Sequence, residues 1–470
     1  MSKEIFPMTI NGVPETSPNS FDVINPATGQ VIAQAPECSR AQLDDAVLKA
    51  QHAQKAWSKQ SIEVRKAKVA ALAEVLTANM DMLKRLLTSE QGKTLGDAEG
   101  ELGFSALWFQ SAQALDLPIE ILEDTIERRT QTQRVPLGVV GAILPWNYPI
   151  LLLVWKIVPA LVAGNAIIIK PSPYTPLTTL RIGELIAPLL PPGLVNIVSG
   201  GDDLGRWLTE HAGIAKISFT GSSATGQRIA ASAASTMKRL TLEMGGNDAA
   251  IVLADANIEA SAQALFWGAM GNSGQVCVAA KRIYVHDQVY DAFKSAFLAV
   301  AETVRVGDGT LQGVQLGPVQ NKAQYARVQG IIADSRAHGH TVISVGDVPD
   351  GGGYFIPVTL VDNPPEASRV VQEEAFGPVV PMLRFTDEAD VIARANATDY
   401  GLAGSVWSAD LEKAAAIAAQ LDCGTVWINT IQDSPIDSPI AGHKHSGLGV
   451  ENGQAGLLEY TNAQTIVLRK

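Results

Sequence analysis

Cys277 lies in a stretch that suits a reactive thiol. Residues 271–278 read Gly-Asn-Ser-Gly-Gln-Val-Cys-Val, and the two glycines allow backbone amides to approach a bound group closely. A buried cysteine that packs as a small apolar side chain is the commoner case, and we expect it for Cys423. Cys38 stands beside charged residues before a helix, so we expect it to be exposed. Cys277 differs from both because the chain also offers a base.

Glu243 is that candidate base. It closes the apolar stretch Leu-Thr-Leu-Glu at 240–243, and two glycines follow Met244. A carboxylate at the end of an apolar strand and next to glycines points into a crevice, where partial burial raises its pKa toward the range of a general base. A helix-cap or loop carboxylate is the alternative, and this segment alone favours neither.

Three more polar positions follow predicted strands. Asn147, between Pro145 and Pro149, offers an amide donor of the kind that stabilises an oxyanion. Lys170 ends the next strand with a charge suited to a ribose hydroxyl or a phosphate. Residues 219–226, Phe-Thr-Gly-Ser-Ser-Ala-Thr-Gly, end a strand and open a helix whose N-terminus suits a phosphate. Each signal is weak alone, but on successive strand ends of one sheet they strongly indicate a functional site.

The elements that position these residues are predicted to be buried parallel strands. Short apolar runs at 139–144, 166–169, 195–198 and 214–219 alternate with helical stretches, and a second series occupies 282–285, 379–383, 405–407 and 424–429. Such runs are typical of strands covered on both faces. Before them, residues 39–92 show two apolar helical stripes, 43–57 and 69–87, which stop near Gly92. We predict an α/β protein with two main domains.

Two further segments are β-rich but charged. They are 126–135, Ile-Glu-Arg-Arg-Thr-Gln-Thr-Gln-Arg-Val, and the tail 464–470, Gln-Thr-Ile-Val-Leu-Arg-Lys. Because each is polar on one face, we expect them to pair as a small protruding sheet.

Composition narrows the class of protein. The 470 residues are 46% hydrophobic and carry a net charge of −12 with scattered basic residues, which argues against nucleic acid or a membrane surface as partner. No apolar run reaches the roughly 20 residues of a membrane span, and residues 1–6 lack the plan of a signal peptide. Three separated cysteines exclude a disulfide framework. We expect a soluble cytoplasmic protein without a metal, in which His443 and His445 are solvated.

From about Phe21 to the C-terminus the chain resembles the non-acylating aldehyde dehydrogenase superfamily. The matching motifs are Pro145-Trp146-Asn147, Lys170-Pro171-Ser172, Phe219 to Ser222 with Gly226, Glu243 to Gly246, Gly274 to Cys277, Glu374 to Pro378, and Gly442 to Gly447. The resemblance implies a Rossmann-like dinucleotide-binding domain from 1–118 and 137–245 and an α/β catalytic domain from 246–452. Segments 119–136 and 453–470 would form a β oligomerisation element, in a homodimer or homotetramer.

The resemblance also implies roles. Cys277 would be the nucleophile, Glu243 the general base, and Asn147 part of the oxyanion hole, while Lys156 and Glu451 would assist proton transfer behind the base. The residues implied to bind NAD, or alternatively NADP, are Leu144, Pro145, Trp146, Lys170, Ser172, Pro173, Thr220, Gly221, Ser222, Gly226, Met244, Glu374 and Phe376.

The implied reaction is NAD(P)-dependent oxidation of an aldehyde to a carboxylic acid. A thiohemiacetal on Cys277 would lose hydride to nicotinamide, and the resulting thioester would be hydrolysed with help from Glu243. The alternatives are a coenzyme A-acylating semialdehyde dehydrogenase, in which the base is often not needed, and a superfamily member without catalysis. Esterase action of the same cysteine is conceivable as a side activity.

Two departures from the family pattern bear on specificity. Pro173 stands where many NAD-preferring members have a glutamate that repels a 2′-phosphate, so the preference for NAD is less secure. The positions expected to line the substrate pocket are Tyr148, Trp155, Gly271, Val276, Ser434 and Ile440. Several are small where aromatic residues are common, which indicates a roomier pocket for a bulky or aromatic aldehyde. The alternative is that Trp155 and Trp267 belong to the core and that the pocket takes small aliphatic aldehydes.

Overall fold

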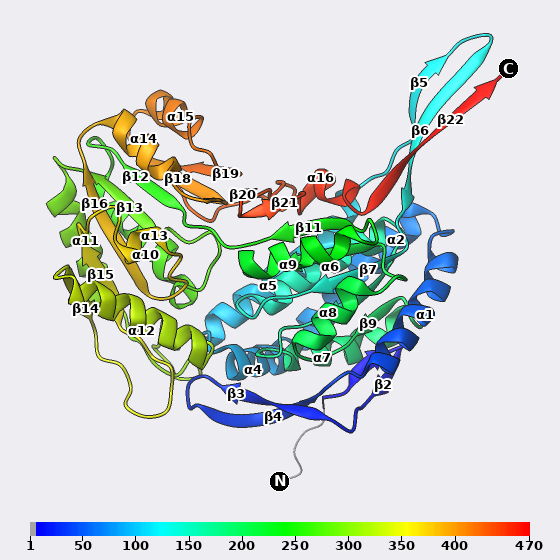
Figure 1. The fold of residues 1–470 in the computed structure, drawn as a ribbon, viewed down its shortest axis with the longest axis horizontal. Coiled ribbons are helices and arrows are strands. Elements are labelled where there is room, and N and C mark those ends of the chain that lie inside the picture. The colour runs from blue at the N-terminus through cyan, green and yellow to red at the C-terminus, as the bar shows by residue number, and fades with distance from the viewer. Residues whose placement is uncertain (1–5) are drawn as a thin grey trace.

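Two large sheets organise the chain in the computed structural model, which describes residues 6–470 (Figure 1). Each sheet carries its own helices, and the two units lie side by side. The first sheet has the order β2-β1-β9-β8-β7-β10-β11-β21. Its strands are β1 (Met8–Ile10), β2 (Val13–Glu15), β7 (Val139–Ile143), β8 (Ala166–Lys170), β9 (Val195–Ile197), β10 (Lys216–Thr220), β11 (Arg239–Glu243) and β21 (Gly447–Leu448). The five central strands are parallel, and β1 and β21 join them antiparallel.

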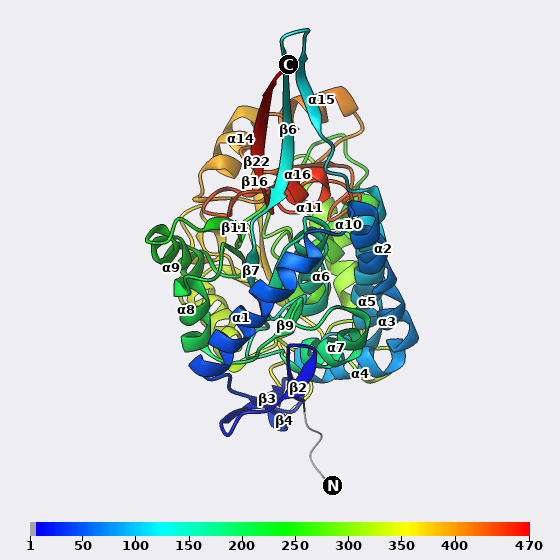
Figure 2. The same cartoon turned by 90° about the vertical axis from the view of Figure 1, so that its right-hand side faces the viewer.

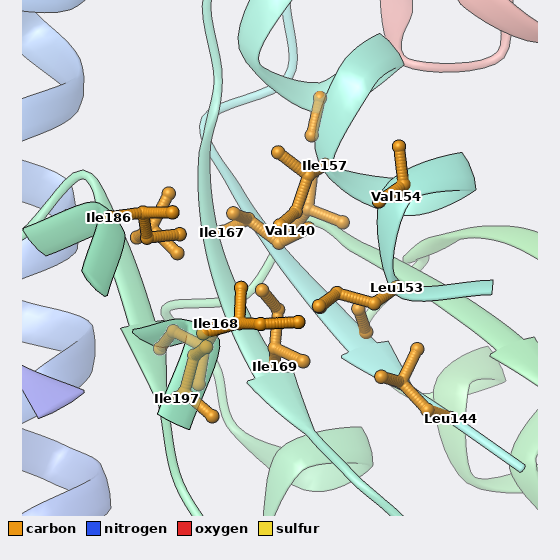
Figure 3. Packing of buried hydrophobic residues seen from close by; sticks show 14 of the residues in the cluster. Val140, Leu144, Leu153, Val154, Ile157, Ile167, Ile168, Ile169, Ile186 and Ile197 are labelled. Carbon is orange, nitrogen blue, oxygen red and sulfur yellow. The ribbon is translucent and has the colours of Figure 1, made fainter. Parts of the chain in front are cut away.

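Helices cover both faces of this sheet. Figure 2 shows α1 (Arg40–Trp57), α8 (Asp202–Glu210) and α9 (Ser223–Ala234) on one side. The other side carries α2 (Ile62–Ala71), α3 (Ala73–Ala78), α4 (Met80–Gln91), α5 (Leu95–Ser111), α6 (Pro149–Val162) and α7 (Leu177–Ile186). Figure 3 shows the isoleucines of β8 packed among side chains of β7, β9 and α6. Such apolar runs form strands because both of their faces are removed from water.

The second sheet has the order β14-β15-β16-β13-β12-β18-β19. Its strands are β12 (Ala249–Val252), β13 (Arg282–His286), β14 (Thr341–Val345), β15 (Val358–Asp362), β16 (Val379–Phe385), β18 (Ala403–Trp407) and β19 (Thr425–Ile428). Its helices are α10 (Ile258–Met270), α11 (Tyr290–Glu302), α12 (Lys322–Ala337), α13 (Arg369–Gln372), α14 (Glu388–Asn396) and α15 (Leu411–Ala418). All eight strands expected from the apolar runs are present, each within about two residues, so these predictions are confirmed.

A three-stranded sheet projects from the molecule (Figure 1). It consists of β5 (Glu120–Asp124), β6 (Arg128–Pro136) and β22 (Thr461–Arg469), with β6 in the middle. The pairing of segments 126–135 and 464–470 is confirmed, because β22 runs antiparallel to β6 along its whole length. The remaining elements are the hairpin β3 (Ser20–Asn25) and β4 (Gln30–Pro36), the pair β17 (Tyr400–Gly401) and β20 (His443–Lys444), helix α16 (Gly453–Leu458), and three 3-10 turns, η1 (Ala112–Ala114), η2 (Ala187–Leu189) and η3 (Gly271–Gly274).

The second apolar stripe of the N-terminal region is not one helix. It is divided among α2, α3 and α4, with breaks at Leu72 and Asn79. Asn79 leaves the helical conformation, and its side-chain amide donates a hydrogen bond to the carbonyl of Val75 at 2.8 Å. Such a side chain competes with the helical hydrogen bonds, which explains a break that apolar spacing does not show. The predicted stop is confirmed, because α4 ends at Gln91 and is followed by Gly92 with φ +97°. Among the described residues, no helix is both long and apolar enough to cross a membrane.

Candidate active site

The loop before Cys277 is held in an unusual backbone conformation. After α10 ends, Asn272, Ser273 and Gly274 have φ values of +50°, +55° and +72°. Two of these residues are not glycine, so the conformation costs free energy and needs support from its surroundings. The Ser273 hydroxyl donates to the carbonyl of Gly317 at 2.6 Å, and the Gln275 amide donates to the carbonyl of Asn272 at 2.8 Å. The structure thus fixes the loop through side chains as well as through its glycines.

Asn147 meets this loop from the other sheet. It lies in the turn between β7 and α6 and is buried. Its Nδ2 donates to the carbonyl of Gln275 at 3.0 Å, and its own carbonyl accepts from Asn272 Nδ2 at 3.2 Å. A side-chain amide carries two N–H donors, so one remains for an oxyanion near Cys277.

Glu243 ends β11 as a buried carboxyl group. Its Oε1 has no hydrogen-bond partner. Burial raises its pKa well above the usual value, the negative charge of Glu451 adds to this rise, and Lys156 opposes it. A buried carboxyl group with an unpartnered oxygen is poised to accept a proton from a water molecule.

Behind Glu243 lies a fully buried ion pair. Lys156 Nζ is 2.6 Å from Glu451 Oε1, and the Ser218 hydroxyl donates to the same oxygen at 3.0 Å. Lys156 interrupts the otherwise apolar helix α6, and a charge is seldom buried unless it is paired. The structure therefore brings Lys156 and Glu451 together with Glu243 from three distant parts of the chain.

Cys277 is half-buried, and its surroundings disfavour the thiolate. Burial raises its pKa to about 12, Lys281 opposes this, and Asp248, Glu243 and Glu374 add to it. Because the thiolate is the nucleophile, reaction requires removal of the proton or additional positive charge at the site.

A cleft beside the first sheet contains Lys170. Its lining, between α8 and α9, includes Ile143, Lys170 and Ile229 together with the charged residues Asp202, Asp203, Arg206, Glu210 and Arg228. Burial lowers the pKa of Lys170 to about 8, against the charges of Asp202 and Glu37. Its Nζ donates only at 3.4 Å, to the carbonyl of Pro171. A cleft that combines apolar side chains with a weakly bonded lysine ammonium group fits an adenosine with its ribose hydroxyls.

The helix expected after Thr220 is also confirmed. Ser222 caps α9 by accepting a hydrogen bond from the backbone N–H of Thr225 at 3.4 Å. Gly226 leaves no room for a side chain, because a Cβ atom there would collide with the sulfur of Met244. The end of β10, with Gly221, thus presents a helix N-terminus next to Met244.

Glu374 and Phe376 come from the second sheet and contact residues of the first. Glu374 Oε1 accepts from the backbone N–H of Gly246 at 3.2 Å. The Phe376 ring stands edge-on to Trp146, with 5.3 Å between ring centroids. Glu374 thus contacts the segment that follows β11, and Phe376 contacts Trp146, which follows β7.

Comparison with known proteins agrees with this arrangement. The family model "Aldehyde dehydrogenase family" matches residues 13–466. The chain belongs to the aldehyde dehydrogenase family. A probable aldehyde dehydrogenase from a Pseudomonas species is 42% identical over all of this chain and 96% of its own length. The enzyme is thus an oxidoreductase that oxidises an aldehyde with a nicotinamide cofactor.

Two solved structures have the same fold as this chain. Betaine aldehyde dehydrogenase from Staphylococcus aureus, in complex with NAD+, superposes with a TM-score of 0.94 at 33% identity, covering 98% of this chain and 94% of that one. An NADP-dependent enzyme from E. coli superposes with a TM-score of 0.95 at 33% identity, covering 99% and 98%.

The substrate-pocket positions are only partly brought together. Trp155 lines a cleft with Trp108, and their ring centroids are 5.6 Å apart. Ile440 and Glu451 exchange two backbone hydrogen bonds of 2.8 Å, so Ile440 lies beside the buried ion pair. The other four positions, Tyr148, Gly271, Val276 and Ser434, do not line the cleft of Trp155.

The prediction for Cys38 is wrong. Its side chain is only 1% exposed, and its backbone N–H donates to the carbonyl of Ser199 at 2.8 Å. The charged neighbour Glu37 accepts a hydrogen bond from the backbone N–H of Gly201 at 2.9 Å, so its charge does not require this segment to be exposed to solvent.

The other two predictions concern Cys423 and two histidines. Cys423 is half-buried rather than fully buried. His443 and His445 are exposed as expected.

Lys93 and Glu101 were not predicted, yet they support Asn147. They form a buried ion pair at 2.5 Å, and Lys93 Nζ also donates to the Asn147 carbonyl at 3.0 Å. Glu101 Oε1 accepts from the backbone N–H groups of Ile150 and Leu151 at 2.8 and 3.1 Å, which caps the first turn of α6. The sequence offered no clear signal, because Glu101 follows Asp97 and Glu99 on α5 and resembles these exposed acidic neighbours.

We predict that Glu101→Gln lowers the free energy of unfolding by about 3–5 kcal/mol, because it leaves the Lys93 charge buried without a counter-charge. The glutamine oxygen can still cap α6, so the substitution isolates the charge. Glu99→Gln on the same helix is the matched control. Glu99 is exposed and pairs with Lys84, so we expect a change below about 1 kcal/mol. Equal losses in chemical denaturation would contradict a role for the buried pair.

Proposed function

We propose that the enzyme converts an aldehyde to its carboxylic acid through a covalent intermediate on Cys277. One observation carries this proposal: the fold brings together a half-buried thiol, a fixed amide donor and an unpartnered buried carboxyl group, those of Cys277, Asn147 and Glu243. The Cys277 sulfur would add to the carbonyl carbon, and the free N–H of Asn147 with the backbone N–H of Cys277 would hold the oxygen.

The second half of the reaction would need water. A bound nicotinamide would supply the hydride acceptor, after which a thioester remains on Cys277. Glu243 would take a proton from water as the water attacks this thioester, and its raised pKa suits that task. The Lys156–Glu451 pair would assist transfer of the proton from Glu243, with the Lys156 charge favouring its release and the Glu451 charge opposing it. The presence of Glu243 favours hydrolysis over transfer to coenzyme A.

We propose NAD as the preferred cofactor, with Lys170 at the adenosine ribose, the N-terminus of α9 near the pyrophosphate, and Glu374 at the nicotinamide ribose. The cleft between α8 and α9 and the weakly bonded Lys170 ammonium in it support this placement. Pro173 provides no carboxylate to repel a 2′-phosphate, so we expect measurable turnover with NADP.

The deciding experiment is an initial-rate assay of reduced nicotinamide with aliphatic and aromatic aldehydes. NAD and NADP are tested in parallel, with and without coenzyme A. Turnover without coenzyme A supports the hydrolytic reaction, whereas strict dependence on coenzyme A would assign the enzyme to the acylating branch. No turnover with any pair would contradict the proposal.

We further propose that the pocket admits bulky or aromatic aldehydes. An added Cβ at Gly271 would meet no atom within 4 Å, so space is open beside the nucleophile loop. We predict that Gly271→Phe lowers kcat/KM for benzaldehyde by about tenfold or more, since overlap with a bound ring costs more than 1.4 kcal/mol. Propanal should be affected much less. Gly271→Ala serves as the control, and equal losses for both aldehydes would count against a roomy pocket.

We propose that the projecting sheet joins subunits into a homodimer or homotetramer. Its strands β5 and β22 have free edges, and its exposed apolar residues include Ile121, Leu122, Ile126, Val467 and Leu468. Such a surface is unfavourable in water. We predict that light scattering after gel filtration gives a dimer or tetramer mass, and that deleting 461–470 yields monomers. A wild-type monomer at all concentrations would refute this.

We also propose a cytoplasmic location, because all three cysteines are unpaired.

A further inference from the structure

Lys281 connects the nucleophile loop with the residue proposed to hold the nicotinamide ribose. It immediately precedes β13 and is buried. Its Nζ donates to the carbonyl of Val276 at 2.9 Å and to that of Cys277 at 2.5 Å. The same Nζ is 3.2 Å from Glu374 Oε1. One ammonium group therefore uses its three donors on the peptide carbonyls beside the thiol and on a carboxylate from another segment.

The main chain of Lys281 is also fixed. Its backbone N–H donates to the carbonyl of Asp248 at 3.0 Å, next to β12. Its side chain passes near the Phe376 ring, with Nζ 5.8 Å from the centroid. The ammonium position is thus determined by contacts at both ends of the side chain, as a positioning role requires.

Lys281 has the opposite effect on the Cys277 thiol to that of the neighbouring carboxyl groups. Three carboxyl groups act on the thiol, those of Asp248, Glu243 and Glu374, and each disfavours the thiolate. Burial raises the pKa of Asp248 to about 7 and that of Glu243 well above its usual value, while the Tyr148 hydroxyl, also close, has a raised pKa and is neutral. Among the largest influences on the thiol, Lys281 favours its ionisation.

We propose that Lys281 is a positioning residue that ties the carbonyls of Val276 and Cys277 to Glu374 and favours the thiolate of Cys277. The inference rests on the proposed roles of Cys277 and Glu374. A lysine that only satisfies buried carbonyl groups would stabilise the fold without changing the reactivity of the thiol. The two roles therefore differ in a measurable way.

The test is the rate at which iodoacetamide alkylates Cys277, followed by mass spectrometry of the peptide that contains it. The reaction needs neither aldehyde nor nicotinamide, and its rate follows the thiolate fraction. For Lys281→Met we expect about tenfold slower alkylation near neutral pH, because loss of a neighbouring positive charge raises a pKa by about one unit. Lys281→Arg keeps the charge and should restore most of the rate.

Two further variants keep the test decisive. Lys281→Gln keeps an amide donor without the charge, so it should fold even if the methionine variant does not, and it should also react slowly. Lys294→Met removes a lysine that pairs with Asp362 on β15 and contacts no proposed site residue, and its alkylation rate should match the wild type. Wild-type rates in folded Lys281→Gln or Lys281→Met would overturn the proposal.

Failure of this inference is distinguishable from failure of the proposed function. If the wild type oxidises aldehydes but Lys281→Met alkylates normally, only the role of Lys281 is refuted. If the wild type oxidises no aldehyde, the alkylation comparison still decides whether Lys281 controls the thiol. In active enzyme, a positioning role also predicts that Lys281→Met raises the KM for NAD severalfold, whereas Lys281→Arg does so less.

Discussion

Cys277→Ala is expected to lower the rate of aldehyde oxidation by about 10⁴-fold or more, as loss of a catalytic nucleophile does in other enzymes. The alanine leaves the loop of Asn272 to Gln275 in place, because the hydrogen bonds that hold it come from other side chains. Binding of NAD, measured by titration calorimetry, should therefore stay within about twofold of the wild type, since a change of less than 0.5 kcal/mol is expected away from direct contacts.

Cys423→Ala is the matched control for this prediction. Cys423 is half-buried, lies beside Gly404 and takes no part in the proposed site. Its activity per folded molecule should equal that of the wild type. Substantial dehydrogenase activity in Cys277→Ala would show that the nucleophile has been assigned to the wrong residue.

Glu243→Gln has the second largest expected effect. Acylation of Cys277 precedes the water step, so the variant should release a first burst of about one equivalent of reduced nicotinamide and then turn over about 10²–10⁴-fold more slowly. Rapid-mixing absorbance measurements separate the burst from the steady state. Glu373→Gln, a half-exposed residue bound to Arg369, is the control and should show normal turnover.

The pH dependence of steady-state turnover follows from the same residue. The base acts in its ionised form, and burial raises the pKa of Glu243 well above the usual value for a carboxyl group. Turnover of the wild type should thus fall as the pH drops through this raised pKa, and the remaining turnover of Glu243→Gln should lack that step. Normal turnover in Glu243→Gln would contradict its assignment as the base.

The strands and their ends were predictable because the signal is local. Isoleucine-rich runs such as 167–169 become strands buried on both faces, and Asn147, Lys170 and Glu243 lie just after or at strand ends, where parallel strands bring polar groups to one edge. The helical region was less predictable. Its apolar spacing continues through Asn79, although that side chain bonds to the carbonyl of Val75 and ends the helix.

The burial of individual polar and charged residues was not predictable from neighbours in the sequence. Cys38 seemed exposed beside charged residues, but Glu37 is turned inward to the backbone of Gly201. Lys93 contacts Asn147 across 54 residues, and Lys156 meets Glu451 across 295. Periodicity contains no information about such partners, because it reports only which face of an element is apolar.

The amino-acid sequence alone determined the chemical types at the site, the strands that carry them and the pairing of the projecting segments. These depend on local patterns: apolar runs, glycine-rich turns and motifs of a few residues. Only the tertiary structure decided which charges surround the thiol. The Lys93–Glu101 and Lys156–Glu451 pairs and the contacts of Lys281 join segments that are distant in the chain. A buried charge is tolerated only where folding brings it a partner, so its environment exists only once both sheets are assembled.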